Sequence, residues 1–256
     1  MTSTTWRLLL HGDASAYKNM ATDEAILRHV VQGTSPCTLR FYGWQPSAVS
    51  IGYFQSVAQE VDVAACQRKG VNIIRRLTGG GAVYHDHAGE ITYSLAIPET
   101  YPDMPRKVLD SYTVLCAGLV RGFAHLGLKA EFKPINDILI GGKKISGNAQ
   151  TRRFGGILQH GTLLCDVDPP LMFSLLKVPD EKIRDKLIAR VEERVTSIRR
   201  ELGTVDKAAV TQAMIAGFTE ALNIHLEPGL LSPEETTLAA QLREERYASQ
   251  AWIYKR

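Results

Sequence analysis

A pair of arginines followed by three consecutive glycines constrains this chain more than any other feature of its sequence. Arg75 and Arg76 end the apolar run that begins at Val71, and Gly79–Gly81 follow shortly after. Glycines let the backbone turn where side chains would clash, and they expose its N–H groups to a ligand. Arginine adds a planar, permanently charged group that suits phosphate or carboxylate. The stretch predicts an anion-binding turn, with a plain flexible turn as the alternative.

A second stretch, Asn136–Ala149, predicts a lysine in a fixed position. An apolar run, the pair Gly141 and Gly142, and a run that carries two lysines together predict a β-hairpin. A hairpin would hold Lys144 on a strand instead of on a mobile loop. Lys143 would then face the opposite side of the strand, toward solvent.

The composition permits a substantial hydrophobic core. The chain has 256 residues, 45% of them hydrophobic, and no abrupt change in composition divides it, so we expect one domain over residues 1–256. No apolar stretch reaches about eighteen residues, and the first residues lack the layout of a signal peptide, which predicts a soluble cytoplasmic protein. The net charge of +3 is small, so we expect neither a nucleic-acid nor a membrane partner.

The four cysteines do not suggest a metal site or a disulfide framework. Cys37, Cys66, Cys116 and Cys165 are widely spaced, without a C-x-x-C pair or a His/Cys cluster at metal-ligand spacing. We therefore expect reduced thiols, with Cys116 as a small core residue of an apolar helix. The sequence also lacks a P-loop motif, and no G-x-G-x-x-G follows a predicted strand.

Hydrophobic periodicity predicts an α+β layout. Strands are expected near 6–11, 38–44, 48–53, 71–76, 90–96 and 130–132, and helices near 16–31, 58–69 and 107–126. A sheet core over about 1–168 should be followed by a mostly helical part over about 169–256. The helices expected there are 171–176, 181–198, 206–221 and 233–247. The periodicity does not define the order of the strands.

The two glycine-containing stretches also carry a resemblance to a known family, the lipoate–protein ligase A family. The matching segments are NMATDEA (19–25), LRFY (39–42), SIGYFQ (50–55), RRLTGGGAVYHD (75–86), NDI…G.KISGNA (136–149), HGTLL (160–164) and LKVPDEK (176–182). The family's catalytic domain is related to biotin ligases and class II aminoacyl-tRNA synthetases. The resemblance implies a mixed, largely antiparallel sheet flanked by helices, in a short form without the C-terminal accessory domain.

The resemblance implies an ATP-dependent lipoate–protein ligase. Lipoate or octanoate would attack the α-phosphate of ATP, and the acyl-adenylate would then meet a lysine amine of a lipoyl carrier domain. Fixed hydrogen-bond donors could lower both barriers without a protein nucleophile. ATP and Mg²⁺ are the implied cofactors, and a dehydrogenase E2 domain or a glycine-cleavage H protein is the implied acceptor. Some relatives need a separate small accessory protein for adenylation, which makes such a protein a further candidate partner.

Lys144 is the catalytic residue that the resemblance implies, because its ammonium could bridge the carboxylate and the α-phosphate. Asp137 would help to hold Mg²⁺ through ATP, with a turn-forming Asn-Asp pair as the alternative. His85 would line the acyl or phosphate pocket, and His160 would orient the backbone nearby. The implied nucleotide-binding residues are Arg76, Gly79, Gly80, Gly81, Ala82, Val83, Tyr84, His85, Asp137, Lys144 and Ala149.

Three alternatives compete with the ligase. An octanoyl- or lipoyl-transferase of the same fold forms a thioester on a cysteine just before the K-x-x-G-x-A motif, and residues 132–137 contain no cysteine. A non-catalytic lipoate-binding subunit is disfavoured because Arg76, the glycines and Lys144 are all present. A biotin ligase is disfavoured because its Gly-Arg-Gly-Arg loop is missing. On these grounds the sequence favours the ligase.

Overall fold

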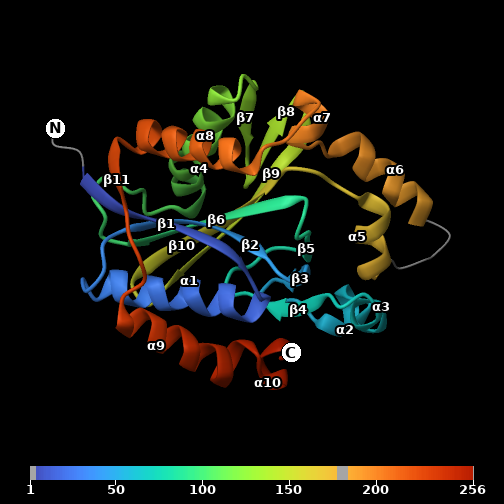
Figure 1. Cartoon of the computed structure of the whole chain (residues 1–256), viewed down its shortest axis with the longest axis horizontal. Helices are drawn as coiled ribbons and strands as arrows, with labels where there is room; N and C mark the ends of the chain where they lie inside the picture. Colours follow the sequence, from blue (N-terminus) through green and yellow to red (C-terminus); the bar gives the residue numbers. More distant parts are fainter. Residues whose placement is uncertain (1–3, 178–183, 256) are drawn as a thin grey trace.

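Two sheets form the framework of the protein, whose computed structural model describes residues 4–177 and 184–255 (Figure 1). The order in the eight-stranded sheet is β11 (Ile224–Pro228), β1 (Thr4–Ala14), β2 (Thr38–Trp44), β6 (Glu90–Pro98), β10 (Gly156–Leu164), β9 (Lys143–Arg153), β8 (Asp137–Ile140) and β7 (Ala130–Lys133). β1 runs parallel to both of its neighbours, and the other pairs are antiparallel. A smaller sheet joins β4 (Asn72–Arg75), β3 (Ala48–Ile51) and β5 (Val83–His85).

Helices cover both faces of the large sheet. α1 (Ala16–Val31) and α9 (Pro233–Leu242) lie on one face, and α4 (Val108–His125) and α8 (Lys207–Leu222) lie on the other (Figure 1). The remaining described helices are α2 (Val57–Glu60), α3 (Val63–Arg68), α5 (Pro169–Leu175), α6 (Arg184–Arg194), α7 (Ile198–Leu202), the π-helical turn η2 (Arg243–Tyr247) and α10 (Gln250–Ile253). The predicted α+β class, with a largely antiparallel sheet flanked by helices, is confirmed. None of the described helices could span a membrane.

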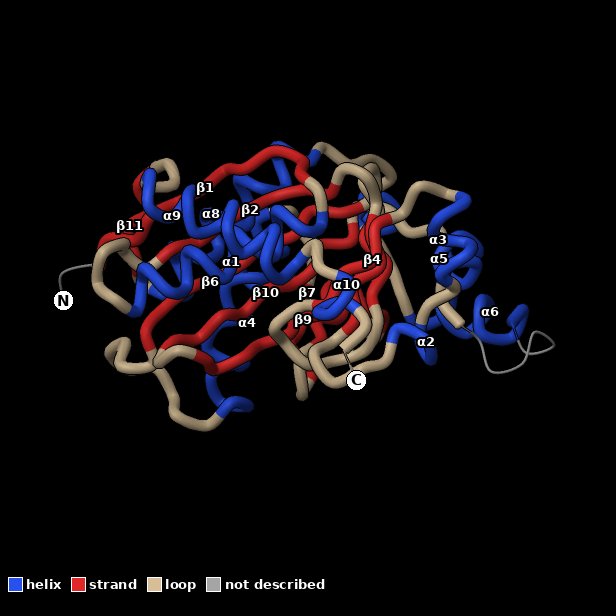
Figure 2. The backbone as a smooth tube through the Cα atoms, turned by 90° about the horizontal axis from the view of Figure 1, so that it is seen from below, coloured by secondary structure: helices blue, strands red, loops and turns tan. Residues whose placement is uncertain are grey.

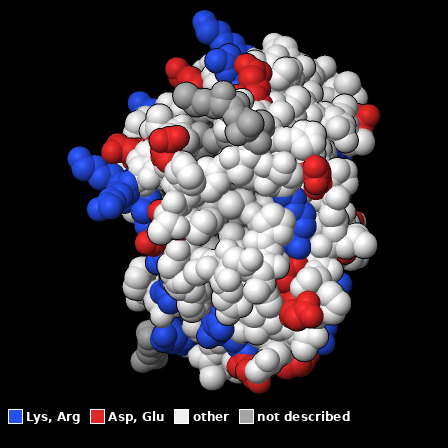
Figure 3. Space-filling model, turned by 90° about the vertical axis from the view of Figure 1, so that its left-hand side faces the viewer, with Lys and Arg blue, Asp and Glu red and all other residues white. Residues whose placement is uncertain are grey.

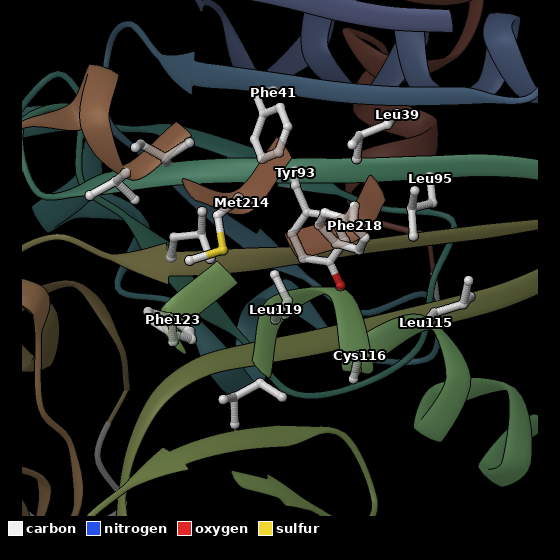
Figure 4. Close-up of a cluster of buried hydrophobic side chains, with 14 of the residues drawn as sticks. Leu39, Phe41, Tyr93, Leu95, Leu115, Cys116, Leu119, Phe123, Met214 and Phe218 are labelled. Atoms are coloured by element: carbon white, nitrogen blue, oxygen red, sulfur yellow. The ribbon is translucent and has the colours of Figure 1, made fainter. Parts of the chain in front are cut away.

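The main hydrophobic core lies between the large sheet and the α4–α8 pair. Phe41 and Tyr93 point from the sheet toward Leu119 of α4 and toward Met214 and Phe218 of α8 (Figure 4). Alternate strand residues point to the other face, where a smaller cluster packs against α1. The two faces are therefore buried by different helix pairs.

α4 and α8 approach each other closely because glycines lie at their crossing. A Cβ built on Gly217 would lie 2.2 Å from the backbone nitrogen of Gly122 and 2.4 Å from the carbonyl oxygen of Gly118. Real side chains do not tolerate such distances to backbone atoms. The crossing therefore requires a residue without a side chain at Gly217.

Charged side chains of both signs are interspersed on the surface. On the face in Figure 3, Lys and Arg side chains and Asp and Glu side chains surround a largely uncharged centre. This distribution agrees with the small net charge of +3. That face shows no broad patch of one sign of the kind that binds nucleic acid.

Arg75 ties the end of the described chain to the loop after β3. Its guanidinium donates to the carbonyl oxygens of Trp252, Ile253 and Lys255 at 2.6–3.0 Å, and to those of three residues in the 52–55 segment. In Figure 2, α10 accordingly lies beside β4. Arg75 is fully buried, so these carbonyl groups replace water around its charge.

Two predicted helices are interrupted in the structure, and the strand β11 lies within the part predicted to be mostly helical. The predicted helix 58–69 is divided into α2 and α3, because Val61 between them forms a β-bridge with Leu176. Of the predicted helix 181–198, residues 181–183 lie outside the described part of the chain, and α6 ends at Arg194 before α7 begins. In both helices the apolar spacing predicted one continuous helix, and a contact or a turn interrupts it.

Candidate active site

The two sheets enclose a cavity of about 340 Å³. It lies where the glycine turn, β5, the hairpin strand β9 and the start of α1 converge. Most of its exposed lining is apolar. The predicted site residues that line it are Arg76, Gly80, Gly81, Ala82, Val83, Tyr84, His85, Lys144 and Ala149. Gly79 and Asp137 are not lining residues, but each bonds to one that is.

Arg76 braces the glycine turn from behind. Its Nε donates to Thr78 Oγ1 at 3.1 Å, and its Nη1 donates to the carbonyl oxygen and the hydroxyl of Ser50 at 3.0 and 2.8 Å. Its Nη2 donates to the carbonyl oxygens of Gly79 and Gly81 at 2.9 and 2.7 Å. These acceptors match the five N–H donors of a guanidinium, which leaves none for a ligand phosphate. Burial lowers the pKa of Arg76 to about 10.

A chain of three polar side chains runs through the cavity wall. Ser50 Oγ lies 2.8 Å from His85 Nε2, and His85 Nδ1 lies 2.8 Å from Glu90 Oε1. The three residues come from β3, β5 and the start of β6, and all are buried. The Trp44 ring stacks on His85 at a centroid distance of 4.0 Å and donates to Glu90 at 3.2 Å. The imidazole is therefore fixed from its face and from both nitrogens.

A second buried network joins α1 to the glycine turn. Asp23 accepts hydrogen bonds from Arg40, Tyr42 and Ser94 at 2.6–3.1 Å. Burial alone would raise the pKa of Asp23, but the charge of Arg40 and the hydrogen bonds hold it below the ordinary value. His160 contributes to this network from β10.

His160 lies between Asp23 and the glycine turn, with a hydrogen bond toward the turn. Its Nε2 lies 2.8 Å from Thr78 Oγ1, whereas its Nδ1 lies 3.7 Å from Asp23 Oδ2 and has no hydrogen-bond partner among the described residues. Burial lowers the pKa of His160, and Asp23 only partly offsets this. The ring holds the Thr78 hydroxyl beside the glycine turn.

Lys144 lies on the hairpin β8–β9 and faces the cavity. Gly141 and Gly142 form its turn with φ values of 56° and 78°, a region that favours glycine. Lys144 Nζ pairs with Asp137 Oδ1 at 2.7 Å, and both side chains are about one-third exposed. Lys143 is exposed. No group of three or more potential metal ligands occurs among the described side chains, and the carboxylate of Asp137 is engaged by Lys144.

All four cysteines lie outside the cavity lining. Cys116 and Cys165 belong to the main core cluster, Cys66 belongs to a separate cluster, and Cys37 is half-buried at the edge of the core. Burial raises the pKa of Cys37 and Cys66 to about 11, and that of Cys116 and Cys165 to about 12. They are protonated thiols at neutral pH.

The sequence did not predict Asp23, Trp44, Ser50 or Glu90 as parts of the site. A signal for two of them was present, since Asp23 lies within the apolar pattern of α1 and Glu90 begins an apolar strand. Acidic residues are rarely buried without a partner, so such positions mark internal networks. Ser50 had no comparable signal, because its role depends on how β3 pairs with β5.

Comparison with known proteins places the chain in a family. The family model for the lipoyl protein ligase A/B catalytic domain matches residues 15–219. The chain belongs to this family. Octanoyltransferase LipM of Kyrpidia tusciae is 42% identical over 275 aligned positions, covering 98% of this chain and 99% of the relative. Octanoyltransferase LipM of Geobacillus kaustophilus is 38% identical over the full length of both chains.

The fold agrees with solved structures of the lipoyl protein ligase A/B family. A structure from Thermoplasma acidophilum, described as a bipartite lipoate protein ligase and its E2 lipoyl domain, superposes with a TM-score of 0.90. It is 33% identical and covers 98% of this chain and 96% of its own. The family predicted from the sequence is therefore confirmed.

The comparisons correct the predicted reaction. The two relatives at 42% and 38% identity, compared with 33% for the Thermoplasma ligase, are named octanoyltransferases. The prediction of an ATP-dependent ligase, with ATP and Mg²⁺ as cofactors, nucleotide binding and an acyl-adenylate intermediate, is therefore wrong. The resemblance of the motifs implied the ligase, and the absence of a cysteine from residues 132–137 was the ground for disfavouring the transferase. The octanoyltransferase relatives outweigh that ground.

Proposed function

We propose that this protein is an octanoyltransferase, which moves an octanoyl group from an activated donor to a lysine amine of a lipoyl carrier domain. The observation that carries the proposal is the 42% identity to an octanoyltransferase across 98% of this chain. The acceptor is proposed from the family and from the E2 lipoyl domain named with the Thermoplasma structure. A glycine-cleavage H protein presents the same kind of lysine. We place the reaction in the cytoplasm, where free thiols such as these four stay reduced.

The cavity suits the apolar tail of the donor. Met20, Trp44, Ala82, Val83 and Met172 contribute to a lining that is mainly apolar. Each methylene removed from water contributes about 0.8 kcal/mol, so an eight-carbon chain gains substantially from such a lining.

Lys144 is the residue that we assign to the reacting carbonyl. Attack on a thioester moves negative charge onto the carbonyl oxygen, and a fixed ammonium stabilises that charge. The ion pair with Asp137 at 2.7 Å fixes the position of the Lys144 ammonium at the cavity wall. The N–H groups of the glycine turn offer further donors. An accessory protein, implied only for adenylation, is not required by this reaction.

The test is octanoyl transfer by the purified chain alone. The assay supplies octanoyl-acyl carrier protein and an apo E2 lipoyl domain, without ATP, and measures the mass of the lipoyl domain. We expect octanoylated domain to form, to decrease about 10²–10³-fold in Lys144→Ala, and to be unchanged in the matched variant Lys143→Ala. Transfer that occurs only with free octanoate and Mg·ATP would overturn the proposal.

A further inference from the structure

A large aromatic side chain beside the glycine turn projects into solvent. Phe54 is 87% exposed, only three residues after the buried strand β3 ends at Ile51. The ring of Tyr53 contacts the Phe54 ring edge-on at a centroid distance of 5.0 Å, and it contacts the Trp252 ring at 5.8 Å. The exposed ring is therefore the outer end of a row of aromatic side chains. Aromatic residues in such positions are enriched where proteins bind one another.

The segment that carries Phe54 is held firmly in place. The buried guanidinium of Arg75 donates to three carbonyl oxygens of the 52–55 segment and to three of residues 252–255, at 2.6–3.2 Å. One side chain therefore joins the loop after β3 to the end of the described chain. A partner that binds an ordered surface does not have to immobilise a loop, which lowers the entropic cost of binding.

Two cations converge on the Tyr53 ring. Arg153 Cζ lies 4.1 Å from the ring centroid. Lys255 Nζ lies 5.0 Å from the centroid and 3.2 Å from the phenol oxygen. Neither cation forms an ion pair with a carboxylate within residues 4–177 and 184–255. Their charges are therefore available to a partner that presents carboxylates.

This aromatic and basic surface adjoins the acyl cavity. The Tyr53 N–H donates to the carbonyl oxygen of Thr78 at 2.9 Å. A Cβ built on Gly52 would lie 2.1 Å from the carbonyl oxygen of Gly80, which lines the cavity. The glycine turn therefore lies between this surface and the cavity. We call the four side chains of the surface the Phe54 platform: Tyr53, Phe54, Arg153 and Lys255.

The platform lies at the opposite end of β9 from Lys144. Arg153 ends β9 and Lys144 is near its start, so the two Cα atoms are about 30 Å apart along the strand at about 3.3 Å per residue. An acceptor domain offers only a lysine side chain, so it must approach Lys144 directly. A donor whose acyl group is carried on a long, flexible thioester arm can dock farther away. Its arm reaches the cavity by crossing the glycine turn.

We propose that the Phe54 platform docks the carrier protein that delivers the octanoyl thioester, through an acidic face of that carrier. This inference rests on the proposed octanoyltransferase function. Phe54 is buried at the centre of the contact, and Arg153 and Lys255 pair with carboxylates of the carrier. Such charge pairs mainly speed association and make it sensitive to salt. The octanoyl chain then enters the apolar cavity over the glycine turn.

The first test compares a carrier-bound donor with a small donor. Octanoyl transfer to an apo E2 lipoyl domain is measured from octanoyl-acyl carrier protein and from octanoyl-pantetheine, a thioester without the protein. Phe54→Ala should raise the KM for octanoyl-acyl carrier protein about 30-fold, with kcat unchanged. Its kinetics with octanoyl-pantetheine should equal those of the wild type. Leu230→Ala is the matched control, since Leu230 is 85% exposed between β11 and α9, and it should change neither donor's kinetics.

The second test concerns the two cations. The double variant Arg153→Glu/Lys255→Glu should lower kcat/KM for octanoyl-acyl carrier protein about 10²-fold at low salt, and it should flatten the dependence of kcat/KM on ionic strength. Arg121→Glu/Lys129→Glu makes the same change in net charge at exposed positions at and just after the end of α4. This control should retain the wild-type kinetics and salt dependence.

Two kinetic results would overturn the proposal. One is wild-type kinetics with octanoyl-acyl carrier protein in both platform variants. The other is a raised KM for the lipoyl domain with an unchanged KM for the donor, which would assign the platform to the acceptor.

Binding of holo-acyl carrier protein, measured by isothermal titration calorimetry, tests the platform without turnover. If the wild-type chain transfers no octanoyl group from either donor, the proposed function fails. Carrier binding that the platform variants weaken would then still support the docking surface. Carrier binding that is absent from the wild type, or unchanged in the variants, would refute it.

Discussion

Arg76→Lys tests directly whether the Arg76 side chain holds the glycine turn in place or binds a ligand. Lysine keeps the charge but has three N–H donors on one atom, where arginine has five on a planar group. At least two of the buried acceptors, which include the carbonyl oxygens of Ser50, Gly79 and Gly81, would lose their partner. An unpaired buried polar group costs about 1–3 kcal/mol, so the free energy of unfolding should fall by about 2–6 kcal/mol.

Urea unfolding followed by tryptophan fluorescence measures this loss, because Trp44 lies in the wall of the cavity. Arg121→Lys is the matched control. Its side chain is 60% exposed and forms a surface pair with Glu220, so a change below about 0.5 kcal/mol is expected. An unchanged unfolding midpoint in Arg76→Lys, together with weaker donor binding, would show that the guanidinium serves the ligand and would refute the bracing argument.

Three further substitutions test the framework around the cavity. Gly217→Ala should destabilise the protein by about 1–3 kcal/mol despite its better helix propensity, because the new methyl group forces α4 and α8 apart; thermal unfolding measures this. Glu235→Ala should cost about 3–5 kcal/mol in urea unfolding, since it leaves the buried charge of Arg7 unpaired. Burial and Arg40 lower the pKa of His11 to about 4, so the native state resists its protonation and stability should fall as pH drops from about 6.5 to about 4. His11→Gln should remove about 1–2 kcal/mol of that fall, since solvent screens this partly exposed ring; identical pH profiles would contradict the assignment.

The elements with strong local patterns were predictable from the sequence. α1 has the predicted bounds because its apolar spacing and the capping residue Ser15 agree, and the hairpin that carries Lys144 follows from its paired glycines. Pairings between strands that lie far apart in the sequence were not predictable. β11 extends the large sheet beside β1, although these strands lie at opposite ends of the chain.

Within the site, residue types were easier to predict than their roles. Arg76 was found, but its side chain points back into the turn, and only the pairing of β3 with its neighbours shows that Ser50 occupies its Nη1. The reaction was predicted wrongly because the motifs resemble those of ligases, and the absence of a cysteine from residues 132–137 disfavoured the transferase.

The buried guanidinium of Arg75 has a consequence for synthesis of the protein. Its acceptors at Trp252, Ile253 and Lys255 are translated about 180 residues after it, so Arg75 leaves the ribosome long before they exist. Until then the guanidinium has only the carbonyl groups of the 52–55 segment as protein acceptors, and water must satisfy its remaining donors. A nascent chain can therefore form most of its sheet before α10 and Lys255 supply three of the six carbonyl groups that surround this charge.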